Sequence, residues 1–364
     1  MVRVKHLTAV LASLAVAVAP VMSLTYWVDK SCLEYPAGPG KTVNLRDGGA
    51  FKEAFRMARI AGRRIDKLNL HGKGKNLELA RAYNYIFTDD PGKTRTIRRG
   101  PEWREKYKSI GFDTVKNVVK DTLTSIGNDW EETRERVGSN VRFYCDNSSR
   151  FIYHPVENQF IDHINSVATD FTCSSSGMDN LAAFETHHRT PNVPDEDNKG
   201  DVSVITLCDH AFNLARLRGK PEMPIPLTHN DLMRLGRLKD KSSVDWFDTL
   251  SHTILHELTH TPRYLHDDHE WNDDEDEDPD TAETGGWESV VMQDEENTAF
   301  NADSYAFFGK LALFMEGNPH DGKKAYALDH DYIKRIEKLP RGRLRHYPGL
   351  EKRGLSWVPR IFRD

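Results

Sequence analysis

The sequence predicts a helix-rich α+β fold with a small sheet. Three observations lead to this prediction: apolar residues recur at helical spacing before residue 136, two alternating segments follow in the middle, and helical spacing returns near residue 244. Helices that flank a short sheet in this way are typical of the α+β class. With 364 residues, the chain is long enough to bury a sizeable core.

Residues 1–23 are typical of a secretory signal peptide. Arg3 and Lys5 precede an apolar run at 7–19, and small residues near Ser23 suit a cleavage site. The run is too short to span a bilayer comfortably, since a span needs about 20 apolar residues. We therefore expect a secreted, extracellular protein without a membrane anchor.

Helices are expected in three segments after the signal peptide, each with one apolar stripe. They cover residues 48–65, residues 77–87 and part of 112–136, where Gly127 could divide the helix. The alternating, β-branched segments 140–145 and 202–208 are expected to be strands.

Four cysteines predict two disulfides in an oxidising compartment. Cys32, Cys145, Cys173 and Cys208 allow three pairings, and no C-x-x-C spacing indicates a cysteine zinc site. The sequon at Asn147 predicts a glycan on a surface loop of a glycoprotein.

Residues 256–260 read His-Glu-Leu-Thr-His, the H-E-x-x-H pattern. His256 and His260 would lie on one face of a helix, where both imidazoles can bind one metal ion. Glu257 would act as general base toward a water at that metal. Apolar residues at helical spacing over 244–258 lead into this helix, with Ser242 or Ser243 as N-cap, and Pro262 should end it soon after His260.

Two histidines do not suffice for a catalytic zinc, which takes a third protein ligand. Several downstream residues could supply it, and the residues alone do not choose among them. The candidates are His266, the acids Asp280, Glu283 and Glu288, and Asp303.

The H-E-x-x-H pattern together with residues 301–306, Asn-Ala-Asp-Ser-Tyr-Ala, resembles the deuterolysin-like (aspzincin) family of secreted fungal zinc metalloendopeptidases, which includes lysine-specific members. The resemblance covers about residues 32–314, although only the two motifs are specific. It implies a zincin-like metallopeptidase fold with an H-E-x-x-H active-site helix, one Zn²⁺ per chain, and protein or peptide substrates.

The chain departs from that family between the two motifs. The family has a Gly-Thr-x-x-Asp-x-x-Tyr-Gly segment, whose aspartate is the third zinc ligand and whose tyrosine steadies the tetrahedral intermediate; here Ala282 and Gly285 stand at those positions. The resemblance assigns substitute roles as follows: Glu283 as third ligand with Asp280 and Asp303 as alternatives, Asp303 as the pocket acid that meets the substrate, and Tyr264 or Tyr305 as oxyanion contact.

Charge is unevenly distributed along the chain, whose net charge is −6. Residues 267–280 are almost solidly acidic, whereas 341–364 are basic, and no dominant basic face indicates a nucleic-acid partner. We expect a metallopeptidase domain at 24–340, with 267–280 as an acidic insertion and 341–364 as a basic tail. The acidic run is either a solvated loop or an attractor of basic peptides.

Two other functions fit the same residues. A degenerate zincin would bind zinc or a partner with little catalysis, because the family tyrosine is missing. A structural secreted protein would make the H-E-x-x-H match accidental and the acidic run a cation-binding or solvated element. The sequence carries no signal for an oligomeric state.

Overall fold

The structure of the chain is a computed structural model. It describes residues 25–38, 41–88, 96–98, 112–128, 130–145, 149–169, 172–174, 183–188, 202–213, 227–234, 244, 248–261, 286–292, 298–316, 325–328 and 344–347. These residues form helices and mainly short strands in separate sheets, so the α+β class is confirmed.

The largest sheet has five strands in the order β11-β12-β7-β1-β6. In that order they are Ala183–His188, Val202–Leu207, Val141–Tyr144, Thr25–Val28 and Glu131–Glu132. The sheet is mixed, because β11 runs antiparallel to β12 whereas the other neighbours are parallel. Side chains of β7 and β12 are largely buried, as parallel central strands require.

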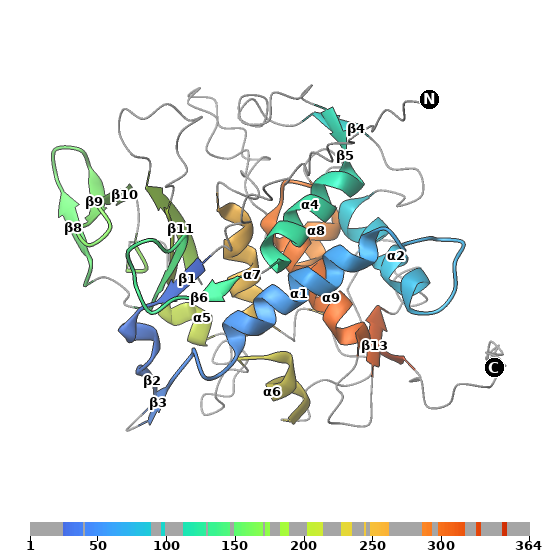
Figure 1. The fold of residues 1–364 in the computed structure, drawn as a ribbon, viewed down its shortest axis with the longest axis horizontal. Helices are drawn as coiled ribbons and strands as arrows, with labels where there is room; N and C mark the ends of the chain where they lie inside the picture. The colour runs from blue at the N-terminus through green and yellow to red at the C-terminus, as the bar shows by residue number, and fades with distance from the viewer. Residues whose placement is uncertain are drawn as a thin grey trace, which may run out of the picture.

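Helices gather beside this sheet (Figure 1). The long helix α1 (Ala50–Ile65) contacts α4 (Val115–Gly127), α7 (Leu250–His260) and α9 (Ala302–Glu316), and α2 (Lys75–Phe87) also contacts α9. Helix α7 additionally contacts strand β11. The core therefore lies around α1 and α9, and α7 joins it to the sheet.

Glycines let these helices approach closely. A Cβ at Gly127 would lie 2.5 Å from the Cα of Arg59, so α4 and α1 meet backbone to backbone there. A Cβ at Gly309 would lie 2.6 Å from Leu255 Cδ2 and 3.3 Å from Met57 Cβ. The second contact places α9 directly against α7 and α1.

Shorter elements complete the described part of the chain. They are η1 (Lys30–Cys32), β2 (Tyr35–Gly38), β3 (Lys41–Val43), β4 (Thr96–Arg98), β5 (Phe112–Thr114), β8 (Phe151–His154), β9 (Gln159–Asp162), β10 (Val167–Thr169), α5 (Asp209–Asn213), α6 (His229–Arg234), α8 (Trp287–Met292), β13 (Ala325–Leu328) and β14 (Leu344–Tyr347). Strands β10, β9 and β8 form a three-stranded antiparallel sheet, and the remaining small strands pair two by two.

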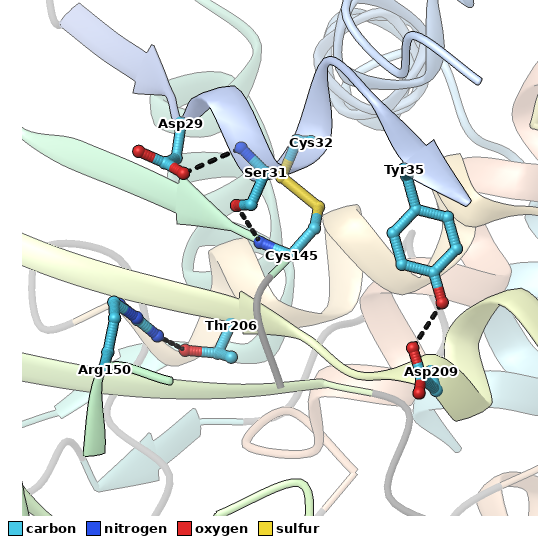
Figure 2. Close-up of a disulfide and its surroundings, with 8 residues drawn as sticks. All are labelled: Asp29, Ser31, Cys32, Tyr35, Cys145, Arg150, Thr206 and Asp209. Atoms are coloured by element: carbon cyan, nitrogen blue, oxygen red, sulfur yellow. Dashed lines mark hydrogen bonds between the residues drawn. A yellow bond between two sulfur atoms is a disulfide. The ribbon is translucent and has the colours of Figure 1, made fainter. Parts of the chain in front are cut away.

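Two disulfides join the sheet to neighbouring segments. Cys32 at η1 bonds Cys145, just after β7, while Cys173 bonds Cys208, just after β12. Figure 2 shows the first of these, where the backbone N–H of Cys145 also donates to Ser31 Oγ at 3.0 Å. The prediction of two disulfides is confirmed, and the structure selects one of the three pairings.

A buried arginine attaches the three-stranded sheet to the main sheet. Arg150 donates to Asp162 Oδ2 at 2.9 Å. It also donates to Thr206 Oγ1 on β12 at 2.6 Å, a hydrogen bond drawn in Figure 2. Its guanidinium also lies over the Tyr144 ring, 3.8 Å from the centroid. Both Arg150 and Asp162 are fully buried, so each charge depends on the other.

Most elements agree with the sequence pattern, with some corrections. Helices α1, α2 and α4 lie where apolar stripes predict them, and α4 ends at Gly127. The predicted start of the later helix is wrong, because α7 begins at Leu250 with Thr249 as its N-cap rather than Ser242 or Ser243. Strands are more numerous than predicted. Residues 344–347, within the expected basic tail, pair with β13.

Within the ranges that the structure describes, none of the helices is long and apolar enough to cross a membrane.

Candidate metal centre

Helix α7 carries the H-E-x-x-H residues, and its two ends are defined by local chemistry. Thr249 Oγ1 accepts a hydrogen bond from the backbone N–H of His252 at 3.2 Å, which satisfies one of the free donors of the first turn. After His260, Thr261 has extended backbone angles (φ −60°, ψ 132°), as expected for a residue that precedes proline. The helix therefore ends directly after the second histidine.

The two histidines form the partly exposed face of an otherwise buried helix. Between Leu250 and His260, only His256 and His260 are not fully buried. Their Nε2 atoms lie 3.1 Å apart. A tetrahedral zinc ion with bonds of about 2.0–2.1 Å to two imidazoles requires nitrogens about 3.3 Å apart. The two rings therefore converge with nearly the spacing that one zinc ion needs.

Asp303, the second residue of α9, holds the other edge of the His256 ring. His256 Nδ1 lies 2.7 Å from Asp303 Oδ1, and the backbone N–H of Gly286 donates to Asp303 Oδ2 at 2.8 Å. His252, one turn earlier on α7, lies 3.8 Å from the same carboxylate through Nε2. The carboxylate thus lies between α7, the start of α8 and α9.

Charges around Asp303 favour its ionised form. Burial alone would raise the pKa of this carboxyl, but nearby His256 and the hydrogen bond from its ring lower the pKa well below its ordinary value. Burial, reinforced by the charge of Lys310, lowers the pKa of His252, so that ring is neutral. An ionised carboxylate only accepts hydrogen bonds, and so Nδ1 of His256 must be the donor.

Lys310 provides a second buried charge near the site, two turns after Asp303 on α9. Its Nζ donates to Asp248 Oδ1 at 3.0 Å and lies 4.2 Å from the centroid of the Phe307 ring. Asp248 immediately precedes the N-cap of α7. This ion pair therefore fixes the start of α7 to α9, on which Asp303 also lies.

Glu257 is buried beside the histidines, with 4% of its surface exposed. Its Oε1 lies 4.0 Å from His256 Nε2. At that distance the carboxylate makes no direct hydrogen bond to the ring, but a water molecule near Nε2 would be within its reach. A carboxylate beside two convergent imidazoles is the arrangement expected of a general base at a metal.

Several predicted site residues lie outside the described residues. These are Asp280, Glu283, Tyr264, His266 and the glycosylation site Asn147, and only the backbone of Glu288 is described. The acidic run 267–280 also lies outside them. Among the ranges that are described, which omit 262–285, no three His, Cys, Asp or Glu side chains gather as a metal site.

Tyr305 is described and lies in the core. Its side chain is fully buried, and its hydroxyl donates to the backbone carbonyl of Ala299 at 2.6 Å. The ring packs edge to face against Phe87. These contacts explain the tyrosine as a packing residue of α9.

Three participants were missed by sequence reasoning: His252, Gly286 and Lys310. His252 carried a usable signal, because it precedes His256 by four residues and so shares its helix face. Gly286 contributes only its backbone, and Lys310 is a cation inside an apolar helix, so neither resembles a site residue in the sequence. Compared with family models and with curated proteins, the chain matches none.

Proposed function

We propose that the protein is a secreted zinc-dependent endopeptidase with a zincin-like active site. The observation that carries the proposal is the pair of Nε2 atoms, 3.1 Å apart, on the exposed face of α7 beside the buried Glu257. Three side chains needed for metal-assisted hydrolysis are thereby adjacent: two imidazole ligands and a carboxylate base. The two disulfides are compatible with an oxidising, extracellular location.

His256 and His260 would hold the zinc through Nε2, and Glu283 is the proposed third ligand. Glu283 lies three residues before Gly286, whose N–H is bound to the same carboxylate that contacts His256. Gly286, the described residue nearest to Glu283 in the sequence, is therefore close to His256. When bound, zinc would supply a Lewis acid that activates water and polarises the scissile carbonyl.

Glu257 would handle the protons of the reaction. Its carboxylate would take a proton from the attacking water as the new C–O bond forms. It would then deliver that proton to the amine nitrogen as the C–N bond of the peptide breaks. With only 4% of its surface exposed, Glu257 would have little room to move between these two steps.

Glu257→Gln tests this assignment directly. The amide has nearly the same shape but cannot accept the proton, so zinc content should stay near one ion per chain while hydrolysis of a denatured protein falls at least 100-fold. Metal content by mass spectrometry and peptide release are the two measurements. Retained hydrolysis in this variant, or a wild-type protein free of zinc, would contradict the proposal.

A weakly catalytic zinc-binding protein is the second candidate. It is favoured by the placement of Tyr305, whose hydroxyl is used by Ala299, together with Gly285 at the position of the family tyrosine. If neither Tyr305 nor Tyr264 supplied a hydroxyl, the developing oxyanion would lose a stabilising group worth about 2.7–4 kcal/mol. One zinc per chain with no release of peptides from wild-type protein would support this candidate over the peptidase.

A further inference from the structure

We propose that Asp303 is a positioning residue, which orients the His256 ring for zinc, and not a zinc ligand or a pocket acid for a basic substrate side chain. The inference rests on the proposed zinc site, because it concerns how one ligand of that site is held. It is carried by the two hydrogen bonds of the Asp303 carboxylate.

The first step concerns which ring nitrogen faces the metal. Asp303 Oδ1 accepts from His256 Nδ1 at 2.7 Å, so the proton is held on Nδ1 and the lone pair remains on Nε2. Nε2 is also the atom that faces Nε2 of His260 at 3.1 Å. The carboxylate thereby selects the tautomer in which His256 presents its lone pair from Nε2, as outer-shell carboxylates do for metal-bound histidines.

The second step excludes Asp303 as a ligand of the same metal. The two ring nitrogens lie on opposite edges of the imidazole, so a zinc at Nε2 would be about 6 Å from an oxygen bound to Nδ1. A zinc–oxygen bond requires about 2.0–2.2 Å. Asp303 could reach the metal only if His256 gave up its hydrogen bond and its orientation.

The third step concerns the pocket role. Only 11% of the Asp303 side chain is exposed, and its second oxygen accepts from the N–H of Gly286. Gly286 has φ +85°, a left-handed conformation that suits glycine, and it begins the turn into α8. A substrate lysine would have to enter a nearly closed position and share oxygens that already accept hydrogen bonds from His256 and Gly286.

One consequence is that Asp303 joins two elements at the site. Through Oδ1 it holds the His256 ring on α7, and through Oδ2 it holds Gly286 at the start of α8.

The experiment measures zinc dissociation constants by chelator competition on the full-length mature protein, for wild type, D303N and the neighbouring control S304A. Ser304 is fully buried on the same turn, and its hydroxyl has no hydrogen-bond partner among the described residues. D303N should bind one zinc about 10–100-fold more weakly. S304A should stay within about twofold of wild type, as a neutral core change allows. X-ray absorption on saturated D303N should show an unchanged number of ligands.

The outcomes separate the possible roles. An unchanged zinc dissociation constant in D303N, with a raised KM for lysyl peptides, would show a pocket acid and overturn the inference. A zinc that loses one oxygen ligand in D303N would show a direct ligand and also overturn it. If wild type binds no zinc, or if H256A binds it normally, the proposed function itself fails.

The wild-type protein gives a second test that does not need a variant to fold. In the zinc-loaded protein, the ¹⁵N chemical shifts of the His256 ring should correspond to a protonated Nδ1 and a metal-bound Nε2. A ring bound to zinc through Nδ1 would overturn the inference.

Discussion

Glu53 is a buried carboxyl whose replacement should stabilise the protein in a pH-dependent way. It lies on α1, where its Oε1 accepts from the backbone N–H of His229 and from Ser251 Oγ, which is 2.8 Å away on α7. Burial raises the pKa of Glu53 from 4.5 to about 7, although those hydrogen bonds and Arg56 oppose the shift. In Glu53→Gln, the amide oxygen can accept the same two hydrogen bonds without ionising.

The direction of the pH effect follows because the pKa of Glu53 is higher in the folded protein than in the unfolded chain. The folded protein holds the proton more tightly, so the contribution of Glu53 to stability is fully present below pH 4.5 and is lost as pH rises through 7. A difference of about 2.5 pKa units corresponds to about 3 kcal/mol, since each unit is worth about 1.4 kcal/mol. Glu53→Gln should therefore be about 3 kcal/mol more stable than wild type at pH 8 and nearly equal to it at pH 4.

Urea unfolding at both pH values measures the effect. The quantity to compare is the difference in unfolding free energy between variant and wild type. This difference is needed because the pH dependence of stability that His229 contributes is opposite in direction to that of Glu53. Burial lowers the pKa of His229 to about 4, so its contribution is present above pH 6.5 and lost as pH falls through 4. Exposed Lys52→Gln on the same helix is the control and should change stability by less than about 0.5 kcal/mol at either pH.

Two results would refute the reasoning. A gain of the same size at pH 4 and pH 8 would mean that Glu53→Gln acts through packing and not through ionisation. A loss of stability at pH 8 would mean that the buried carboxylate is ionised and stabilised by its donors.

Three further predictions concern the fold and the acidic run. Asp162→Asn should lower the unfolding free energy by about 3–5 kcal/mol in urea, because it removes the buried carboxylate that forms an ion pair with the buried Arg150; a loss below about 1 kcal/mol would contradict this. Gly127→Ala should destabilise by about 1–3 kcal/mol, since the clash with the Arg59 backbone exceeds the helix propensity gained, and an unchanged melting temperature would argue against it. Changing the acids of 267–280 to Asn and Gln should remove a preference for basic peptides that also shrinks at high salt; a preference indifferent to both changes leaves the run as a solvated loop.

The periodic spacing of apolar residues predicted the buried helices and strands, because packing one face of an element in the core is what produces that spacing. The apolar stripe of α1 and the alternation of β12 each follow from one face packed in the core. Strands β8 and β9 gave no such signal. Ile152 and Tyr153 are adjacent in β8, point to opposite faces and are both exposed, at 59% and 48%, so their apolar character does not alternate with burial.

The site shows the same division between local and distant information. Histidine spacing on one helix is local, so His256 and His260 could be paired from sequence alone. The contact between His256 and Asp303 joins residues 47 positions apart and depends on how α9 packs against α7. From the sequence, Asp303 could be a zinc ligand or a pocket acid. The residues around it do not indicate that its carboxylate contacts the Nδ1 edge of the His256 ring.

The position of β1 in the main sheet has a consequence for how the protein folds. Although β1 is the first described strand, its partners are β6 and β7, and Thr25 pairs with Glu131 more than a hundred residues later. The centre of the sheet therefore cannot assemble until much of the chain has been synthesised, and such distant pairing is slow. Cys32 and Cys145 close the same long loop, so this disulfide holds the segment after β1 close to the end of β7, the partner of β1. We expect refolding from the reduced state to be slower than refolding with this disulfide intact.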